Sequence, residues 1–290
     1  MSTIIVTVQA PAKINLFLKI KGKRDDGYHE LLTVFQSVDL CDTLHIGLEG
    51  RGITIHAPTY LPQHSGNLAY SAASLFYAAT GLCPGVLIEL KKQIPLQAGL
   101  GGGSSDAAAV LRALNMLYDF PLSADQAQGL ASRLGSDVAF FLYGGTAVGR
   151  GKGEIIEPLP DLRPLWFRLV KPPFGLSTPL VYNEWTGESE ADWERFMQSL
   201  KGPMEELCLF NDLETPASRI RPQIGVLKSQ LLQDGAIQAL LSGSGSTVFG
   251  VYTQQPNAEL TLPDGYCQWI VKALSRAEVE GGYGYGKGVQ

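Results

Sequence analysis

A glycine-rich stretch, PLQAGLGGGSSDAA at residues 95–108, constrains the fold of this chain more than any other segment. Glycine can take positive φ and leaves main-chain N–H groups uncovered, but it loses more conformational entropy on folding than other residues. A strand-like segment, GVLIELKK at 85–92, precedes the stretch, and an amphipathic helix is expected from about Ser105 to Tyr118. A strand, a glycine loop and a helix N-terminus in this order favour a phosphate-binding site over a purely structural turn, which remains the alternative.

The loop does not fit two familiar phosphate motifs. A P-loop needs a lysine followed by Ser or Thr after its last glycine, and Ser104-Ser105-Asp106 stands there instead. In the dinucleotide fingerprint the sixth position counted from Gly99 is glycine, but here it is Ser104, and no acidic strand end follows at the required distance. We therefore expect bare main-chain amides and a helix dipole to bind phosphate, with Ser104 and Ser105 capping the helix or donating to phosphate oxygens.

Mixed strand and helix signals without a steady βαβ alternation predict an α+β fold. Asn67 and Ser123 are expected to cap two helices that end at Gly81 and Gly135. Glycine and proline over 149–164 indicate a domain boundary near residue 160. Later expected elements are a helix over 190–200, a helix over 218–232, two strands joined by GSGS within 236–252, a strand over 267–273 and a frayed tail from 281.

Composition excludes several classes of protein. The net charge is −5 without long runs of like charge, which argues against a nucleic-acid-binding face or a membrane-binding face. We expect neither a membrane span nor an N-terminal targeting leader, because apolar runs are too short and the start has no such pattern. The four cysteines lie far apart and form no zinc-type pairs, which favours reduced thiols and a cytoplasmic location.

The glycine loop resembles the phosphate-binding loop of the GHMP kinase superfamily, small-molecule kinases that include galactokinase, homoserine kinase and mevalonate kinase. Three further segments are similar to the branch that phosphorylates a sugar alcohol carrying a cytidine diphosphate: PAKINLFLKIKGKRDDGYHEL, LGSDVAFFLYGGTAVGRGKGE and LSGSGSTVFG. The resemblance implies a two-domain GHMP kinase fold. Its N-terminal domain (1–160) would be like domain 2 of ribosomal protein S5 and carry the ATP loop, and its C-terminal domain (161–290) would be ferredoxin-like and complete the acceptor site.

The resemblance also implies ATP as the phosphoryl donor, accompanied by Mg²⁺, for which the sequence indicates no ligand. Gln97 departs from the family pattern, which has glycine there, so the first half of the loop is expected to lie less close to the nucleotide. The positions that match the family's nucleotide site are Asn67, Pro95, Leu96, Gln97, Ala98, Gly99, Leu100, Gly101, Gly102, Gly103, Ser104 and Ser105.

Lys13 and Asp137 match the family's catalytic lysine and aspartate. The residues themselves agree with this role, since Lys13 interrupts an uncharged strand and Asp137 precedes the apolar run VAFFL. Alternation places Lys13 and Asn15 on the same strand face. Taken singly, Lys13 could be a lysine whose stem lies along a strand, and Asp137 could be a residue that favours a helix start.

The family holds cytosine between aromatic rings, and Tyr28 and Tyr182 match those positions. The resemblance puts His29 at the edge of the base, where hydrogen bonds decide which base is bound. Other matching positions are Asn15 near the sugar alcohol, and Lys152 and Thr178 near the diphosphate or the sugar. Packing roles for the two tyrosines and the histidine are the alternative.

Two alternative functions and two structural questions stay open at this point. Another GHMP kinase, of homoserine or mevalonate type, would share the glycine loop without needing the aromatic positions, and a nucleotide-binding sensor would need no catalytic pair. The GSGS segment at 243–246 could be either a hairpin turn or the superfamily's third glycine motif. The sequence does not fix the oligomeric state, for which we expect a monomer or a weak homodimer.

Overall fold

The computed structural model describes residues 4–256 and 259–287 and confirms the α+β architecture. An eight-stranded sheet has the order β12-β1-β2-β4-β3, with β5 and β6 added beyond β2 and β8 beside β1. Its strands are β1 (Ile4–Lys23), β2 (His29–Gly47), β3 (Gly52–His56), β4 (Gly85–Lys91), β5 (Thr146–Gly151), β6 (Ile155–Pro158), β8 (Phe210–Asn211) and β12 (Tyr283–Lys287). A four-stranded antiparallel sheet, in the order β11-β7-β10-β9, contains β7 (Trp166–Lys171), β9 (Gln238–Leu241), β10 (Val248–Tyr252) and β11 (Cys267–Lys272).

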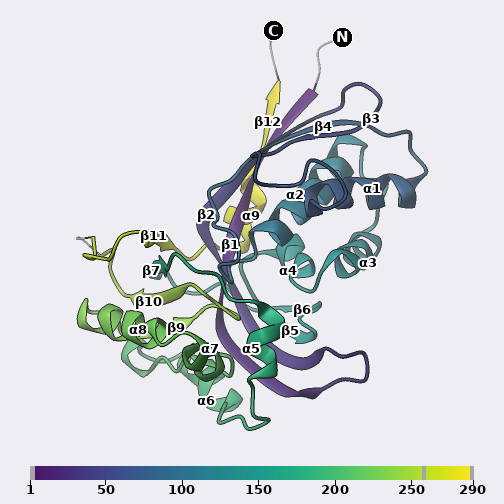
Figure 1. Ribbon diagram of the computed structural model, residues 1–290. Helices are drawn as coiled ribbons and strands as arrows, with labels where there is room; N and C mark the ends of the chain where they lie inside the picture. The colour runs from purple at the N-terminus through teal and green to yellow at the C-terminus, as the bar shows by residue number, and fades with distance from the viewer. Residues whose placement is uncertain (1–3, 257–258, 288–290) are drawn as a thin grey trace.

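Helices cover the outer faces of both sheets (Figure 1). The first half of the chain contributes α1 (Leu68–Thr80), α2 (Gly102–Leu117), α3 (Ala124–Leu134) and α4 (Val138–Tyr143). The second half contributes α5 (Thr178–Asn183), α6 (Trp193–Ser199), α7 (Glu214–Ile220), α8 (Gln223–Gln233), α9 (Arg276–Gly281) and a single 3₁₀ turn at Met204–Glu206. Within the described part of the chain, no helix is long and apolar enough to cross a membrane.

The two longest strands, β1 and β2, pair antiparallel and run through both halves of the molecule in Figure 1. The apolar side chains of this pair belong to different clusters along its length, because α2 packs against one part of the pair and the second sheet against another. Ile14 and Phe17 of β1 lie in one apolar cluster with Phe167 and Phe249 of the second sheet. The interior between the two sheets is therefore built from residues of both halves.

Local signals predicted several helix ends correctly. The Asn67 side chain accepts from the Ala69 N–H and caps α1, and Ser123 forms a capping box with Gln126 at the start of α3. The expected start of α2 at Ser105 is wrong. The helix begins at Gly102, and its N-cap is Gly101 in the left-handed conformation, with no side-chain capping bond. Ser105 lies inside the first turns and does not cap the helix.

The second half differs from expectation at two further places. The expected helix over 218–232 is two helices, α7 and α8, because Pro222 lacks an N–H and disfavours helical backbone in the residue before it. The tail expected to fray forms β12, which pairs antiparallel with residues 4–8 of β1, while 288–290 lie outside the described residues. The GSGS segment joins β9 to β10 as expected. The boundary near 160 falls between β6 and β7 and stays a prediction, since β8 and β12 return to the first sheet.

Candidate active site

The glycine loop lies between the two sheets and is held by main-chain bonds from both. The Lys13 N–H of β1 donates to the Leu100 carbonyl at 3.0 Å, and the Thr247 N–H donates to the Ala98 carbonyl at 3.2 Å. The Ser242 hydroxyl donates to the Gly99 carbonyl at 2.9 Å. These bonds engage the carbonyl groups of three successive loop residues, Ala98, Gly99 and Leu100.

Positive backbone angles explain two of the glycines. Gly99 has φ 74° and Gly101 has φ 72°, a region that L side chains rarely adopt. A Cβ on Gly99 would overlap the Ser242 carbonyl oxygen, and one on Gly101 would lie 2.8 Å from the Phe141 ring. The loop therefore needs glycine at both positions for conformation and for space.

Gln97 also has positive φ, at 50°, and this explains why a glycine is expected there. Its side chain lies against Gly175, in the segment that follows β7, because a Cβ on Gly175 would lie 3.0 Å from the Gln97 Cβ. Gln97, which stands where the family has glycine, thus contacts the second half of the chain.

One side of the loop forms the wall of a cavity of about 250 Å³, called here the loop cavity. Its lining consists of Leu68, Lys92 and residues 94–104, which include the predicted nucleotide-binding positions Pro95 to Ser104. Two of the predicted nucleotide-binding positions, Asn67 and Ser105, do not line the loop cavity. Ser105 is buried behind the wall, and both ends of the Asn67 amide are engaged, by the Ala69 N–H at 3.0 Å and the Pro62 carbonyl at 3.1 Å.

Lys13 and Asp137 face each other, with Lys13 Nζ 3.6 Å from Asp137 Oδ2. The lysine side chain is 5% exposed and the aspartate 34% exposed, so the pair lies at the wall of an open site. Lys13 Nζ also donates to Asn15 Oδ1 at 2.7 Å, and Asn15 donates to Thr33 Oγ1 at 2.8 Å. Asp137 is the N-cap residue of α4 but makes no side-chain capping bond, so its carboxylate is available to a ligand.

A larger cavity of about 790 Å³, called here the acceptor cavity, opens beside this pair. It brings together all the predicted acceptor positions, which are Asn15, Tyr28, His29, Lys152, Thr178 and Tyr182, with Lys13 and Asp137. Gln97, Gly99 and Gly101 line both cavities. The glycine loop is therefore the shared wall between them.

The aromatic positions already contact groups of the chain. The His29 ring stacks on Tyr182, with ring centroids 4.9 Å apart, and Lys152 Nζ lies 4.5 Å from the centroid of the Tyr28 ring. Burial, followed by the charge of Lys23, lowers the pKa of His29, which favours a neutral ring. Burial and then the nearby Asp137 charge raise the pKa of Tyr182, so its hydroxyl stays protonated.

The GSGS segment is a hairpin turn and also a part of the site, so the two alternatives are compatible. Gly243, Ser244 and Gly245 line the acceptor cavity. A Cβ on Gly243 would lie 3.3 Å from both Lys13 Nζ and Asn15 Oδ1. Ser244 Oγ lies 2.8 Å from Thr178 Oγ1 at the start of α5. The sequence reasoning left these residues out of the site because a glycine hairpin has no signal that distinguishes the two roles.

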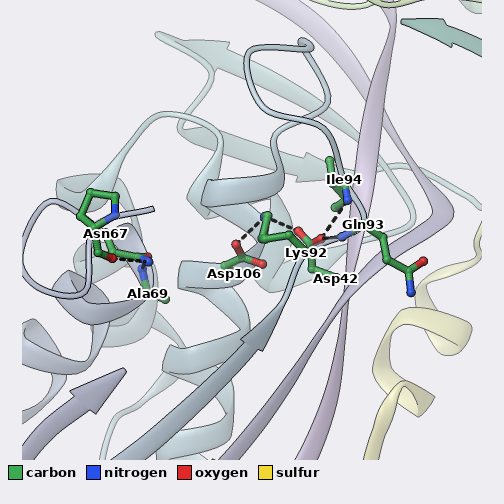
Figure 2. Close-up of polar contacts among 8 residues, drawn as sticks. Asp42, Asn67, Ala69, Lys92, Gln93, Ile94 and Asp106 are labelled. Carbon is green, nitrogen blue, oxygen red and sulfur yellow. Dashed lines mark hydrogen bonds and ion pairs between the residues drawn. The ribbon is translucent and has the colours of Figure 1, made fainter. Parts of the chain in front are cut away.

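A buried ionic cluster lies beneath the loop cavity, and the sequence analysis does not predict it. Lys92 Nζ forms ion pairs with Asp42 Oδ2 and, at 2.7 Å, with Asp106 Oδ2 (Figure 2). Asp42 Oδ1 also accepts from the Gln93 and Ile94 N–H groups, at 2.6 and 2.9 Å. These residues come from β2, the segment after β4, and α2, and no spacing pattern connects them. We call Asp42, Lys92 and Asp106 the buried triad.

The residues that the structure describes do not form a ready-made metal site. In residues 4–256 and 259–287, no group of three or more His, Cys, Asp or Glu could hold a metal ion. Asp106, the carboxylate of the glycine-loop segment, is engaged by Lys92. We therefore assign no protein ligand to Mg²⁺.

Comparison with known proteins identifies the class first. The family models for the GHMP kinases N terminal domain and the GHMP kinases C terminal domain match residues 67–145 and 191–262. A crystal structure of homoserine kinase from Cytophaga hutchinsonii has the same fold, with a TM-score of 0.68 at 21% identity over 88% of this chain and 86% of that chain. The fold is thus that of a GHMP-type small-molecule kinase, a class that uses ATP.

Closer relatives narrow the class. A 4-diphosphocytidyl-2-C-methyl-D-erythritol kinase of Moorella thermoacetica is 45% identical over 85% of this chain and 90% of its own, and one of Desulfitobacterium hafniense is 38% identical over 95% and 98%. A crystal structure of 4-(cytidine 5'-diphospho)-2C-methyl-D-erythritol kinase matches with a TM-score of 0.78 and 36% identity, over 92% of this chain and 98% of that chain. The chain belongs to the 4-diphosphocytidyl-2-C-methyl-D-erythritol kinase family.

Proposed function

We propose that the protein transfers the γ-phosphoryl group of ATP to the 2-hydroxyl of 4-(cytidine 5'-diphospho)-2-C-methyl-D-erythritol, a step of the non-mevalonate isoprenoid pathway. The observation that carries the proposal is the position of Lys13 and Asp137 in the acceptor cavity, beside the glycine loop that separates this cavity from the loop cavity. Because Gln97, Gly99 and Gly101 line both cavities, a triphosphate and an acceptor bound there would lie next to each other at the loop, where in-line phosphoryl transfer needs them.

In the proposed reaction, the triphosphate accepts hydrogen bonds from main-chain amides of the loop and lies at the N-terminus of α2. The acceptor hydroxyl lies next to Asp137, which accepts its proton as the oxygen bonds to the γ-phosphorus and the bond to the β-phosphate oxygen breaks. Lys13, paired with Asp137 and oriented by Asn15, holds the carboxylate in place and stabilises negative charge on the transferred group. Mg²⁺, carried by the phosphates, would neutralise part of their charge.

The cytidine end would lie in the part of the acceptor cavity formed by Tyr28, His29 and Tyr182. One face of each tyrosine ring contacts Lys152 or His29, so a base can stack on the remaining face or take the place of these groups. A neutral His29 has both a donor and an acceptor for the edge of a base. Lys152 and Thr178 are proposed to bind the diphosphate or the sugar.

An ATP-consumption assay with a panel of alcohols tests the proposal. The panel contains the cytidylylated methylerythritol, mevalonate, homoserine and galactose, and product analysis by mass spectrometry confirms the transfer. We expect turnover with the cytidylylated acceptor alone. Turnover with homoserine or mevalonate instead would identify another GHMP kinase, and ATP binding without turnover of any acceptor would indicate a sensor.

A further inference from the structure

The buried triad connects three segments that meet under the glycine loop. The side chains of Lys92, Asp42 and Asp106 are 3%, 0% and 4% exposed, so all three are shielded from water. Asp42 belongs to β2, Lys92 follows β4, and Asp106 lies on α2 (Figure 2). Breaking a buried ion pair leaves an uncompensated charge, so each member depends on the other two.

Lys92 also reaches the first turn of α2. It lines the loop cavity, and a Cβ on Gly102, the first residue of α2, would lie 3.2 Å from Lys92 Nζ. Asp106 lies one turn further along the same helix. The ammonium group is thus placed between two carboxylates and the helix end whose N–H groups are proposed to bind phosphate.

The charges in the triad contribute to the electrostatic potential at that helix end. Burial alone would lower the pKa of Lys92, but the Asp106 and Asp42 carboxylates raise it above its ordinary value, so Lys92 stays charged. Burial raises the pKa of Asp106 to about 8; the charge of Lys92 opposes this shift and Asp42 adds to it. Among the described residues, Asp106 Oδ1 has no hydrogen-bond partner. Without the ammonium, Asp42 and Asp106 would lose their shared partner: carboxylates left charged would repel an anion at the amides above, and protonated ones would lose the ion pairs that hold the first turn of α2.

We infer that Lys92 is a positioning residue for the nucleotide: held between Asp42 and Asp106, it fixes the first turn of α2 and offsets the carboxylate charge beneath the amides that receive the phosphates. The inference rests on the proposed function, since it assumes ATP in the loop cavity. It assigns Lys92 an effect on nucleotide binding and none on acceptor binding.

Binding of a non-hydrolysable ATP analogue with Mg²⁺, measured by calorimetry, tests the inference together with steady-state kinetics. Lys92→Met should weaken analogue binding and raise the KM for ATP about tenfold or more, with the KM for the acceptor unchanged. Lys92→Arg, which keeps the charge, should recover part of the loss. Lys91→Met, at the exposed neighbouring position, is the matched control and should behave as wild type.

Asp106→Asn provides a second variant that keeps the volume and removes the titrating carboxyl group. Analogue binding by the wild type should weaken between pH 7 and 9, as ionised Asp106 adds negative charge, and binding by Asp106→Asn should change less over that range. Should Lys92→Met fail to fold, the same measurements on Lys92→Arg still decide the question. Equal losses for ATP and acceptor in Lys92→Met or in Lys92→Arg would overturn the inference. Absence of analogue binding by the wild type would instead overturn the proposed function.

Discussion

The Lys13–Asp137 pair shows how one lysine can serve two purposes through different atoms. Its ammonium faces Asp137 and Asn15, while its main-chain N–H donates to the Leu100 carbonyl in the glycine loop. Because the side chain is 5% exposed and held by two partners, little ordering is left to be done when the acceptor binds.

Replacing Asp137 by Asn tests the proposed base. The substitution keeps the size of the side chain and removes the proton acceptor, so kcat should fall by about 10²- to 10⁴-fold, while the affinity for the ATP analogue changes little. Rapid-quench or steady-state kinetics together with calorimetry measure the two quantities. Asp264→Asn, an exposed aspartate in the second half, is the control. Retention of most of the activity by Asp137→Asn would remove this residue from the chemistry.

Removing either aromatic ring tests the acceptor end of the site. Stacking on a ring is worth about 1–3 kcal/mol per base, so Tyr28→Ala and Tyr182→Ala should each raise the KM for the acceptor about fivefold or more and leave the KM for ATP near wild type. Tyr28 is 56% exposed, so its loss should not change the melting temperature, whereas Tyr182 is partly buried against an apolar cluster and its loss should lower the melting temperature. Tyr60→Ala, 64% exposed, is the control. Equal changes in both KM values would contradict the pocket.

The residues of the site differ in how far sequence can reveal them. Lys13 and Asn15 could be placed together because strand alternation is local, and the structure joins them at 2.7 Å. That Asp137 lies beside Lys13 could be predicted only through the family resemblance, because the two residues are far apart in the chain. The buried triad has neither signal: Asp42, Lys92 and Asp106 meet only because three elements pack together.

At the scale of elements, the glycine loop depends on space as well as on φ. Alanine at Gly99 should lower the melting temperature and abolish most activity, because its Cβ would overlap the Ser242 carbonyl and the backbone has φ 74°. Gly129, in the exposed middle of α3, has nothing within 4 Å of a Cβ, so Gly129→Ala should stabilise the fold by about 0.5–1 kcal/mol. Thermal melts and kinetics compare the two variants. A Gly99→Ala protein with wild-type activity would show that the loop can move.

Element boundaries were predictable where a side chain marks them. Asn67 and Ser123 cap their helices through side-chain oxygens, which is a local signal. The start of α2 at Gly102 has no such mark, because its N-cap, Gly101, has no side chain. Pairing of β8 and β12 with β1 was unpredictable for another reason: the partners lie far apart in the chain, and nothing in a short strand shows which edge it will join.

For the whole molecule, the shared interior predicts that the two halves do not fold alone. A fragment of residues 1–160 would lose β8, β12 and the second sheet, and so expose Ile14 and Phe17, which pack with Phe167 and Phe249. We expect this fragment to show no cooperative unfolding transition by circular dichroism. Co-expression of 1–160 with 161–290 should restore the transition, since the missing surfaces are then supplied. A stable, cooperatively folded 1–160 fragment would instead establish an independent domain.

The bond between the Lys13 N–H and the Leu100 carbonyl has a consequence for how the reaction is aligned. This bond joins the strand that carries Lys13 to the loop proposed to bind the triphosphate, so a main-chain contact sets how the two segments lie relative to each other. Exchanging the lysine head group would leave that contact in place.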